Sequence, residues 1–82
     1  MHEILFSDTA LRQLRKLETE TQRRIIAALE RIRIRPDAYV AKLVGDPAYR
    51  LRVGDYRVIL DIERDKLSIL VLNVGHRGNI YK

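Results

Sequence analysis

The stretch YRLRVGDYRVILDI, residues 49–62, limits the possible folds more than any other part of the chain. Arg50 and Arg52 alternate with apolar residues, and a second, mostly apolar run follows the Gly54-Asp55 pair. Alternation with a period of two is typical of a β-strand, and glycine with aspartate between two such runs is typical of a tight hairpin turn. The sequence therefore predicts two antiparallel strands joined by a short turn.

The N-terminal half shows helical periodicity. A short apolar run at 3–7 predicts a first strand, and Ser7-Asp8 at its end is a favourable helix-capping pair. A leucine at every third position then predicts a helix that begins near Asp8, and a second apolar stripe predicts another helix over 21–35. Pro36 ends this second helix, because the residue before a proline avoids the helical region. The two helices are expected to form an αα-hairpin.

The C-terminal half continues the sheet. Residues 36–48 predict a loop, and RDK at 64–66 predicts a second turn. The near-continuous apolar run LSILVLNV at 67–74 predicts a strand buried on both faces, followed by a loop GHRGN and a short terminal strand IYK. The expected fold is α+β: an N-terminal strand, an αα-hairpin, and an antiparallel meander of three or four strands with the helices packed on one face. We expect the first strand to lie beside the strand at 67–74.

Length and composition narrow the class of protein. A chain of 82 residues is too short for two cores, so residues 1–82 are expected to form one domain. It contains no cysteine and only two distant histidines, which predicts no disulfide, no metal site and no cofactor. The N-terminus has no charged leader followed by an apolar stretch, and no apolar run is long enough to cross a membrane. We expect a soluble, cytoplasmic protein without a membrane partner.

Basic side chains dominate the charged residues. The net charge of +5 and the pI of about 10.0 favour a polyanion or an acidic protein as partner. Arg50, Arg52 and Arg57 are predicted to gather on the sheet face that the helices leave open, with Arg57 near enough to reach Arg52. Like charges on paired strands repel, and a guanidinium fits phosphate oxygens in bidentate fashion, so we expect a phosphate backbone to complete this site. The alternative is a set of solvated charges on an exposed face.

The segment VGHRGNIY, residues 74–81, carries the remaining candidates. His76 and Arg77 are expected in a loop at a strand end, on the basic half of the sheet, and Tyr81 follows soon after. Histidine is the side chain that most readily exchanges a proton near neutral pH, so His76 is a candidate for proton transfer. Tyr81 could donate a proton or hold a nucleotide. The alternative for both residues is a structural or incidental role.

Two segments together resemble a known family. KLVGDPAYRLRVGDYRVILDI at 42–62 and VGHRGNIY at 74–81, in this order and spacing, are similar to the RelE/ParE superfamily of toxins, and more specifically to its RelE-like branch. The expected order of strand, two helices, long loop and meander also matches. The resemblance covers most of the chain and implies the toxin of a type II toxin–antitoxin system.

The RelE-like branch carries further implications. The resemblance implies a ribosome-dependent endoribonuclease that cuts messenger RNA in the ribosomal A site, by metal-free attack of the ribose 2′-hydroxyl on the adjacent phosphate. It implies a cognate antitoxin that wraps the toxin and blocks it. It also implies binding to operator DNA through the antitoxin complex, in which the antitoxin makes most of the DNA contacts.

Two groups of site residues are expected, and within them the resemblance implies Arg50, Arg52, Arg57, Arg77 and Tyr81. Those expected to bind RNA or its phosphates are Lys42, Arg50 and Arg52. Those expected to be catalytic are Arg57, His76, Arg77 and Tyr81. Well-studied members carry lysines where this chain has Arg50 and Arg52, and an arginine cannot act as a base because it keeps its proton. The general base therefore stays open between His76 and Tyr81.

Two other functions also stay open. A ParE-like toxin with this fold would bind DNA gyrase and cut nothing, although it would have no reason to keep a phosphate site on its sheet. A degenerate toxin would act only as an antitoxin-bound corepressor, which the missing lysines allow.

Overall fold

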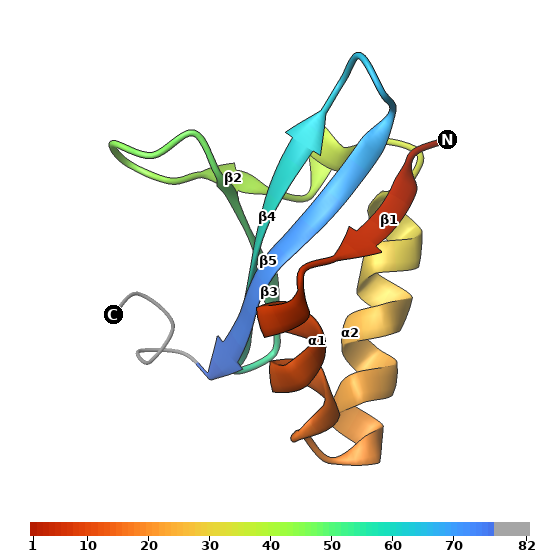
Figure 1. Ribbon diagram of the computed structural model, residues 1–82, viewed down its shortest axis with the longest axis vertical. Coiled ribbons are helices and arrows are strands. Elements are labelled where there is room, and N and C mark those ends of the chain that lie inside the picture. The colour runs from red at the N-terminus through yellow and green to blue at the C-terminus, as the bar shows by residue number, and fades with distance from the viewer. Residues whose placement is uncertain (77–82) are drawn as a thin grey trace.

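The computed structural model describes residues 1–76, which form a five-stranded sheet with two helices (Figure 1). The strands are β1 (Glu3–Phe6), β2 (Ala41–Lys42), β3 (Tyr49–Val53), β4 (Tyr56–Glu63) and β5 (Ser68–His76). The helices are α1 (Asp8–Arg15) and α2 (Thr19–Ile32), and a short 3₁₀ helix covers Pro36–Ala38. This order confirms the predicted α+β fold with an αα-hairpin.

The strands lie in the order β1-β5-β4-β3-β2. Strands β2 to β5 form an antiparallel meander, whereas β1 pairs with β5 in parallel, with Ile4 opposite Ile69. The prediction that the first strand lies beside the last long strand is therefore confirmed. The order also places β4 at the centre of the sheet.

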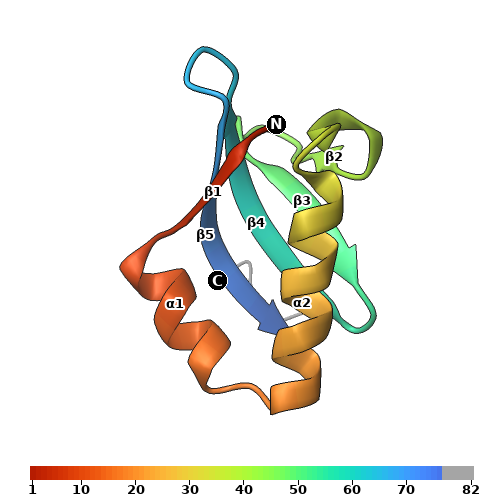
Figure 2. The same ribbon diagram turned by 90° about the vertical axis from the view of Figure 1, so that its right-hand side faces the viewer.

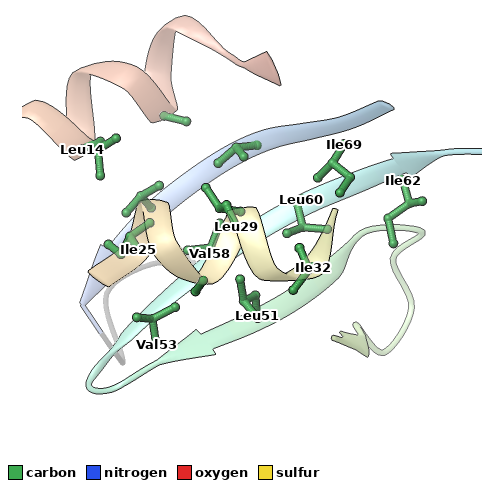
Figure 3. Packing of buried hydrophobic residues seen from close by; sticks show 14 residues of the cluster. Leu14, Ile25, Leu29, Ile32, Leu51, Val53, Val58, Leu60, Ile62 and Ile69 are labelled. Carbon is green, nitrogen blue, oxygen red and sulfur yellow. The ribbon is translucent and has the colours of Figure 1, made fainter. Parts of the chain in front are cut away.

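Both helices pack on one face of the sheet (Figure 2). The core combines Ala10 and Leu14 of α1 with the predicted apolar stripe of α2 and one alternating set of strand residues. Ile25, Leu29 and Leu60 are among its fully buried side chains (Figure 3). Burial of one such side chain stabilises the fold by about 1.5–3 kcal/mol. No described helix covers the opposite sheet face, which we call the open face.

Helix α2 begins and ends earlier than the predicted range 21–35. The residue before its first turn is Glu18, whose side chain makes no capping hydrogen bond. Instead, the side-chain amide of Gln22 donates to the carbonyl of Leu17 at 2.8 Å, while the Gln22 backbone N–H donates to the carbonyl of Glu18. The chain leaves the helix before Pro36, which starts the 3₁₀ helix. Neither described helix combines the length and apolarity needed to span a membrane.

Strand β5 extends through Gly75 and His76, which the sequence had placed in a loop. It also contains a β-bulge, which the sequence did not predict. The register against β4 shifts between Ile59 and Leu60, so Leu72 is the extra residue on β5. A shift of one residue exchanges the two faces for every side chain beyond it. The bulge therefore decides which residues of the second half of β5 lie on the open face.

Two side chains, Ser7 just before α1 and Gln13 within α1, satisfy the backbone at the bulge. The Ser7 hydroxyl donates to the carbonyl of Leu72 at 3.0 Å and accepts from the N–H of Ala10 at 3.0 Å, so the same group also caps α1. The side-chain oxygen Oε1 of Gln13 accepts from the N–H of Val74 at 2.6 Å. Helix α1 is therefore bound to the point at which β5 changes register.

We expect Gln13→Ala to lower the free energy of unfolding by about 1–3 kcal/mol, because the N–H of Val74 would lose its acceptor in the protein interior. The matched control is Gln13→Glu, which keeps an acceptor oxygen at the same place. Urea denaturation followed by circular dichroism measures both variants. Equal losses of stability in the two would contradict a stabilising role for the hydrogen bond to Val74.

Candidate nucleic-acid interface

Three arginines share the open face. Arg52 on β3 lies directly opposite Arg57 on β4, and Arg50 lies opposite Ile59 on the same face. Side chains directly opposite on antiparallel strands have Cβ atoms about 4.5–5.5 Å apart, and diagonal neighbours are about 7–8 Å apart. The register confirms the prediction that Arg57 lies within reach of Arg52. It also places Arg50 diagonally across from Arg57.

The three guanidinium groups differ in their exposure to water. Arg52 is exposed, whereas Arg50 and Arg57 are half-buried, and Nε of Arg57 is shielded from solvent. Partial burial lowers the local dielectric constant, which strengthens the attraction of these groups for an anion. Two guanidinium groups on directly opposite residues repel each other, and an anion that contacts both removes this repulsion. The arrangement is therefore suited to binding a phosphate group between β3 and β4.

Strand β5 adds a polar group and a glycine to the open face. Gly75 lies opposite Arg57 and contributes no side chain there. Asn73 lies opposite Ile59 and brings an amide, which can both donate and accept hydrogen bonds. Asn73 was not among the predicted site residues. Its signal was the one amide side chain inside the mostly apolar run at 67–74.

Lys42 lies away from the three arginines. The register of β2 pairs it with Tyr49, and its Nζ lies 5.3 Å from the centroid of the tyrosine ring. Tyr49 packs against the core on the helix side of the sheet. The expectation that groups Lys42 with Arg50 and Arg52 is therefore not met in space, because a cation–π contact holds the ammonium group near a residue of the other face.

His76 also lies on the helix side of the sheet. It pairs with Tyr56, and the two rings meet edge to face with their centroids 5.4 Å apart. Tyr56 itself packs against the core. His76 therefore lies on the opposite face of the sheet from Arg57, and its catalytic role stays a prediction. The bulge at Leu72 is the physical reason, because an unbroken register would have turned His76 to the open face.

Arg77 and Tyr81 lie outside the described residues, so their roles stay predictions. In residues 1–76, no three histidine, aspartate or glutamate side chains gather as metal ligands would. The chemistry that the described part of the site offers is electrostatic: the fixed positive charge of the arginines and one amide at Asn73.

Solved structures with this fold include toxins and toxin–antitoxin complexes. A chain of the RelBE2 toxin–antitoxin complex from Mycobacterium tuberculosis aligns with 93% of this chain and 98% of its own length, with 24% identity and a TM-score of 0.85. The isolated RelE toxin of E. coli aligns with 96% of this chain and 87% of its own length, with 24% identity and a TM-score of 0.83. A chain of the intact E. coli RelBE complex aligns with 96% of this chain and 100% of its own length, with 26% identity and a TM-score of 0.82. The protein therefore has the fold of the RelE-like toxins.

The family follows from the sequence. The family model of the ParE toxin of the type II toxin–antitoxin system parDE matches residues 4–81, which is nearly the whole chain. The chain belongs to this toxin family. No curated protein sequence matches it closely.

We expect sodium tripolyphosphate to raise the Tm of the wild-type chain more than that of Arg52→Gln, because an anion held between Arg52 and Arg57 binds the native state alone. In the absence of the anion, the free energy of unfolding of Arg52→Gln should equal that of the wild type or exceed it slightly, because the variant removes one member of a like-charged pair. Thermal unfolding at matched ionic strength measures both effects. Arg12→Gln on α1 removes the same charge elsewhere, and equal shifts for all three proteins would contradict this anion site.

Proposed function

We propose that this chain is a toxin of a type II toxin–antitoxin system that cleaves messenger RNA in the A site of the ribosome. The observation that carries the proposal is the pair of directly opposed arginines, Arg52 and Arg57, with Arg50 diagonal to them on the open face. The fold shared with the isolated RelE toxin of E. coli supports the same reading. A protein that only bound another protein would have no need for opposed positive charges on an uncovered sheet face.

The proposed reaction is a transesterification within the RNA. The 2′-oxygen attacks the adjacent phosphorus, the bond from phosphorus to the 5′-oxygen breaks, and the products carry a 2′,3′-cyclic phosphate and a 5′-hydroxyl. Negative charge grows on the phosphate oxygens as the pentavalent transition state forms. Preorganised donors aimed at such a developing charge are commonly the largest catalytic contribution. Arg57 and Arg77 are assigned this role, while Arg50 and Arg52 hold the RNA backbone.

The two proton transfers need groups other than arginine, which keeps its proton. His76 is poorly placed for them, because its ring contacts Tyr56 on the opposite side of the sheet from Arg57. We therefore assign the donation of a proton to the leaving 5′-oxygen to Tyr81. In this proposal, the proton of the 2′-hydroxyl passes to solvent or to a group of the ribosome.

The ribosome and a cognate antitoxin are the proposed partners. A single face of a small domain cannot by itself fix an RNA strand for in-line attack, and the ribosomal A site would supply that orientation. Toxins of this fold occur in complexes with their antitoxins, as in the RelBE complex of E. coli. The net charge of +5 suits an acidic antitoxin, and contact with operator DNA would come through the antitoxin complex.

Arg57→Ala is expected to reduce messenger RNA cleavage by about 10²–10³-fold, as is typical for the loss of one donor to a transition-state charge. Primer extension on messenger RNA after brief induction measures the cuts, and growth of the culture measures toxicity. Arg12→Ala, which removes an exposed arginine of α1, is the control for charge and expression. Undiminished cleavage by Arg57→Ala would refute the assignment.

Tyr81→Phe separates proton transfer from stacking. If the hydroxyl group donates the proton, this variant should lose about 10²–10⁴-fold in cleavage, whereas Tyr81→Ala should lose no less. If the ring only stacks on a base, Tyr81→Phe should cleave like the wild type while Tyr81→Ala alone is impaired. The same primer-extension measurement distinguishes the two results, and the second one would overturn the proposed role as acid.

A second function is favoured by one observation, namely that the matching family model describes a ParE toxin. On this reading, the chain would bind DNA gyrase and cut no RNA. A supercoiling assay with purified gyrase tests it directly. Inhibited gyrase with intact messenger RNA would replace the ribonuclease proposal. Intact messenger RNA with active gyrase and normal growth would point to a corepressor that acts only with its antitoxin.

A further inference from the structure

A cleft lies between α2 and the turn that joins β3 to β4. Figure 2 shows α2 alongside β3 at this edge of the sheet. The volume of the cleft is about 320 Å³. Three arginines surround a floor of small side chains, and the residues that matter here are Arg24, Arg31, Arg52, Ala27 and Ala28. The proposed function makes no use of Arg24 or Arg31.

The spacing along α2 opens the cleft between two positive charges. Arg24 and Arg31 stand two helical turns apart, which is roughly 10 Å along the helix axis. Ala27 and Ala28 lie between them on the same side of the helix. Because alanine side chains are short, they leave room for an anion between the two guanidinium groups.

In the described chain, no carboxylate pairs with the arginines of the cleft. Within residues 1–76, neither Arg24, Arg31 nor Arg52 forms a salt bridge with a carboxylate. Arg33, by contrast, contacts Glu30 on the same helix at 2.9 Å. Three cationic side chains that line one cleft without an acid create a concentrated positive potential, which attracts anions.

Gly54 brings Arg24 close to the hairpin turn. Its φ angle is +60°, a conformation that glycine adopts without the cost that other residues incur. The Nη2 atom of Arg24 lies 2.8 Å from the position that a Cβ atom at residue 54 would occupy. A side chain at this position would therefore displace the guanidinium group. The glycine permits both the turn and the close packing of Arg24 against it.

Arg52 connects the cleft with the open face. It lies opposite Arg57 in the sheet register, and its side chain also lines the cleft. In the described chain, β2 pairs only with Tyr49 and Arg50, so the edge of β3 beyond them is not covered by another strand. Positive charge therefore continues from the open face, around the edge of β3, to α2.

We propose that this cleft is a second phosphate-binding site, which holds the backbone of the same RNA strand that lies on the open face. The proposal rests on the proposed function and extends it, since it gives the RNA a path around β3 and a contact with α2. The floor favours a nucleic acid over a peptide. A bound peptide helix needs pockets for bulky apolar anchors, and Ala27 and Ala28 offer none.

The test measures how strongly the full-length chain binds oligodeoxyuridine at several salt concentrations, by fluorescence anisotropy. This probe carries a phosphate backbone but lacks the 2′-hydroxyl, so it cannot be cleaved by the proposed reaction. The variant is Arg24→Gln with Arg31→Gln. The matched control is Arg15→Gln with Arg23→Gln, which removes the same charge from exposed positions outside the cleft.

For single strands, each phosphate contact contributes about 0.7 to the magnitude of the slope of log K against log salt concentration. The cleft variant removes two contacts, so the magnitude of its slope should fall by about 1.4, and that of the control should fall much less. Equal slopes for both variants, with cleavage by the wild type intact, would overturn the cleft while leaving the proposed function in place. If the wild-type chain does not cleave messenger RNA, the proposed function is overturned, whatever slopes are measured. Polyglutamate serves as a second probe. If the cleft variant loses affinity for polyglutamate but binds the oligonucleotide like the wild type, the ligand of the cleft is an acidic protein, and the proposal is overturned.

Discussion

The fold of the candidate site depends on how the backbone of β5 is satisfied at its bulge. The hydroxyl of Ser7 and the amide of Gln13 take up backbone groups of Leu72 and Val74 that an interrupted ladder would otherwise leave without partners. Both side chains belong to the start of the chain, whereas the bulge lies near its end. The position of α1 and the register of β5 are therefore set together. A change at Gln13 is a change to the open face, although Gln13 lies on the helix side.

The arginines of the open face destabilise the sheet when no anion is bound. Directly opposed arginines weaken the pairing of β3 with β4, and like charges at such positions cost on the order of 0.2–1 kcal/mol. The core on the other face offsets this cost, because one large buried side chain contributes more than that. Stability and binding are thus divided between the two faces of a single sheet. The same strands bury Leu51 and Val58 against the helices and turn Arg52 and Arg57 outward.

The sequence predicted those features that a local pattern encodes. The alternation around Gly54 gave the hairpin and the arginine pair, and the apolar stripes gave both helices and the face they cover. The bulge was not predictable, because a near-continuous apolar run shows no alternation that would reveal a change of register. The face on which His76 lies was consequently not predictable either. Lys42 was misplaced for a related reason, since β2 is too short to show a periodicity and its register is visible only through its pairing with Tyr49.

Arginine at positions 50 and 52 changes how the proposed catalysis can depend on its surroundings. A lysine can exchange a proton when burial depresses its pKa, so it can combine binding with proton transfer. An arginine stays charged, and it therefore contributes binding and transition-state stabilisation at any physiological pH. The proton steps must then be controlled by other groups, and His76 faces away from the arginines. In the proposed reaction, such a site would bind its phosphate without regard to pH and leave the rate to Tyr81 and to the ribosome, so that separate residues would determine substrate affinity and catalytic rate.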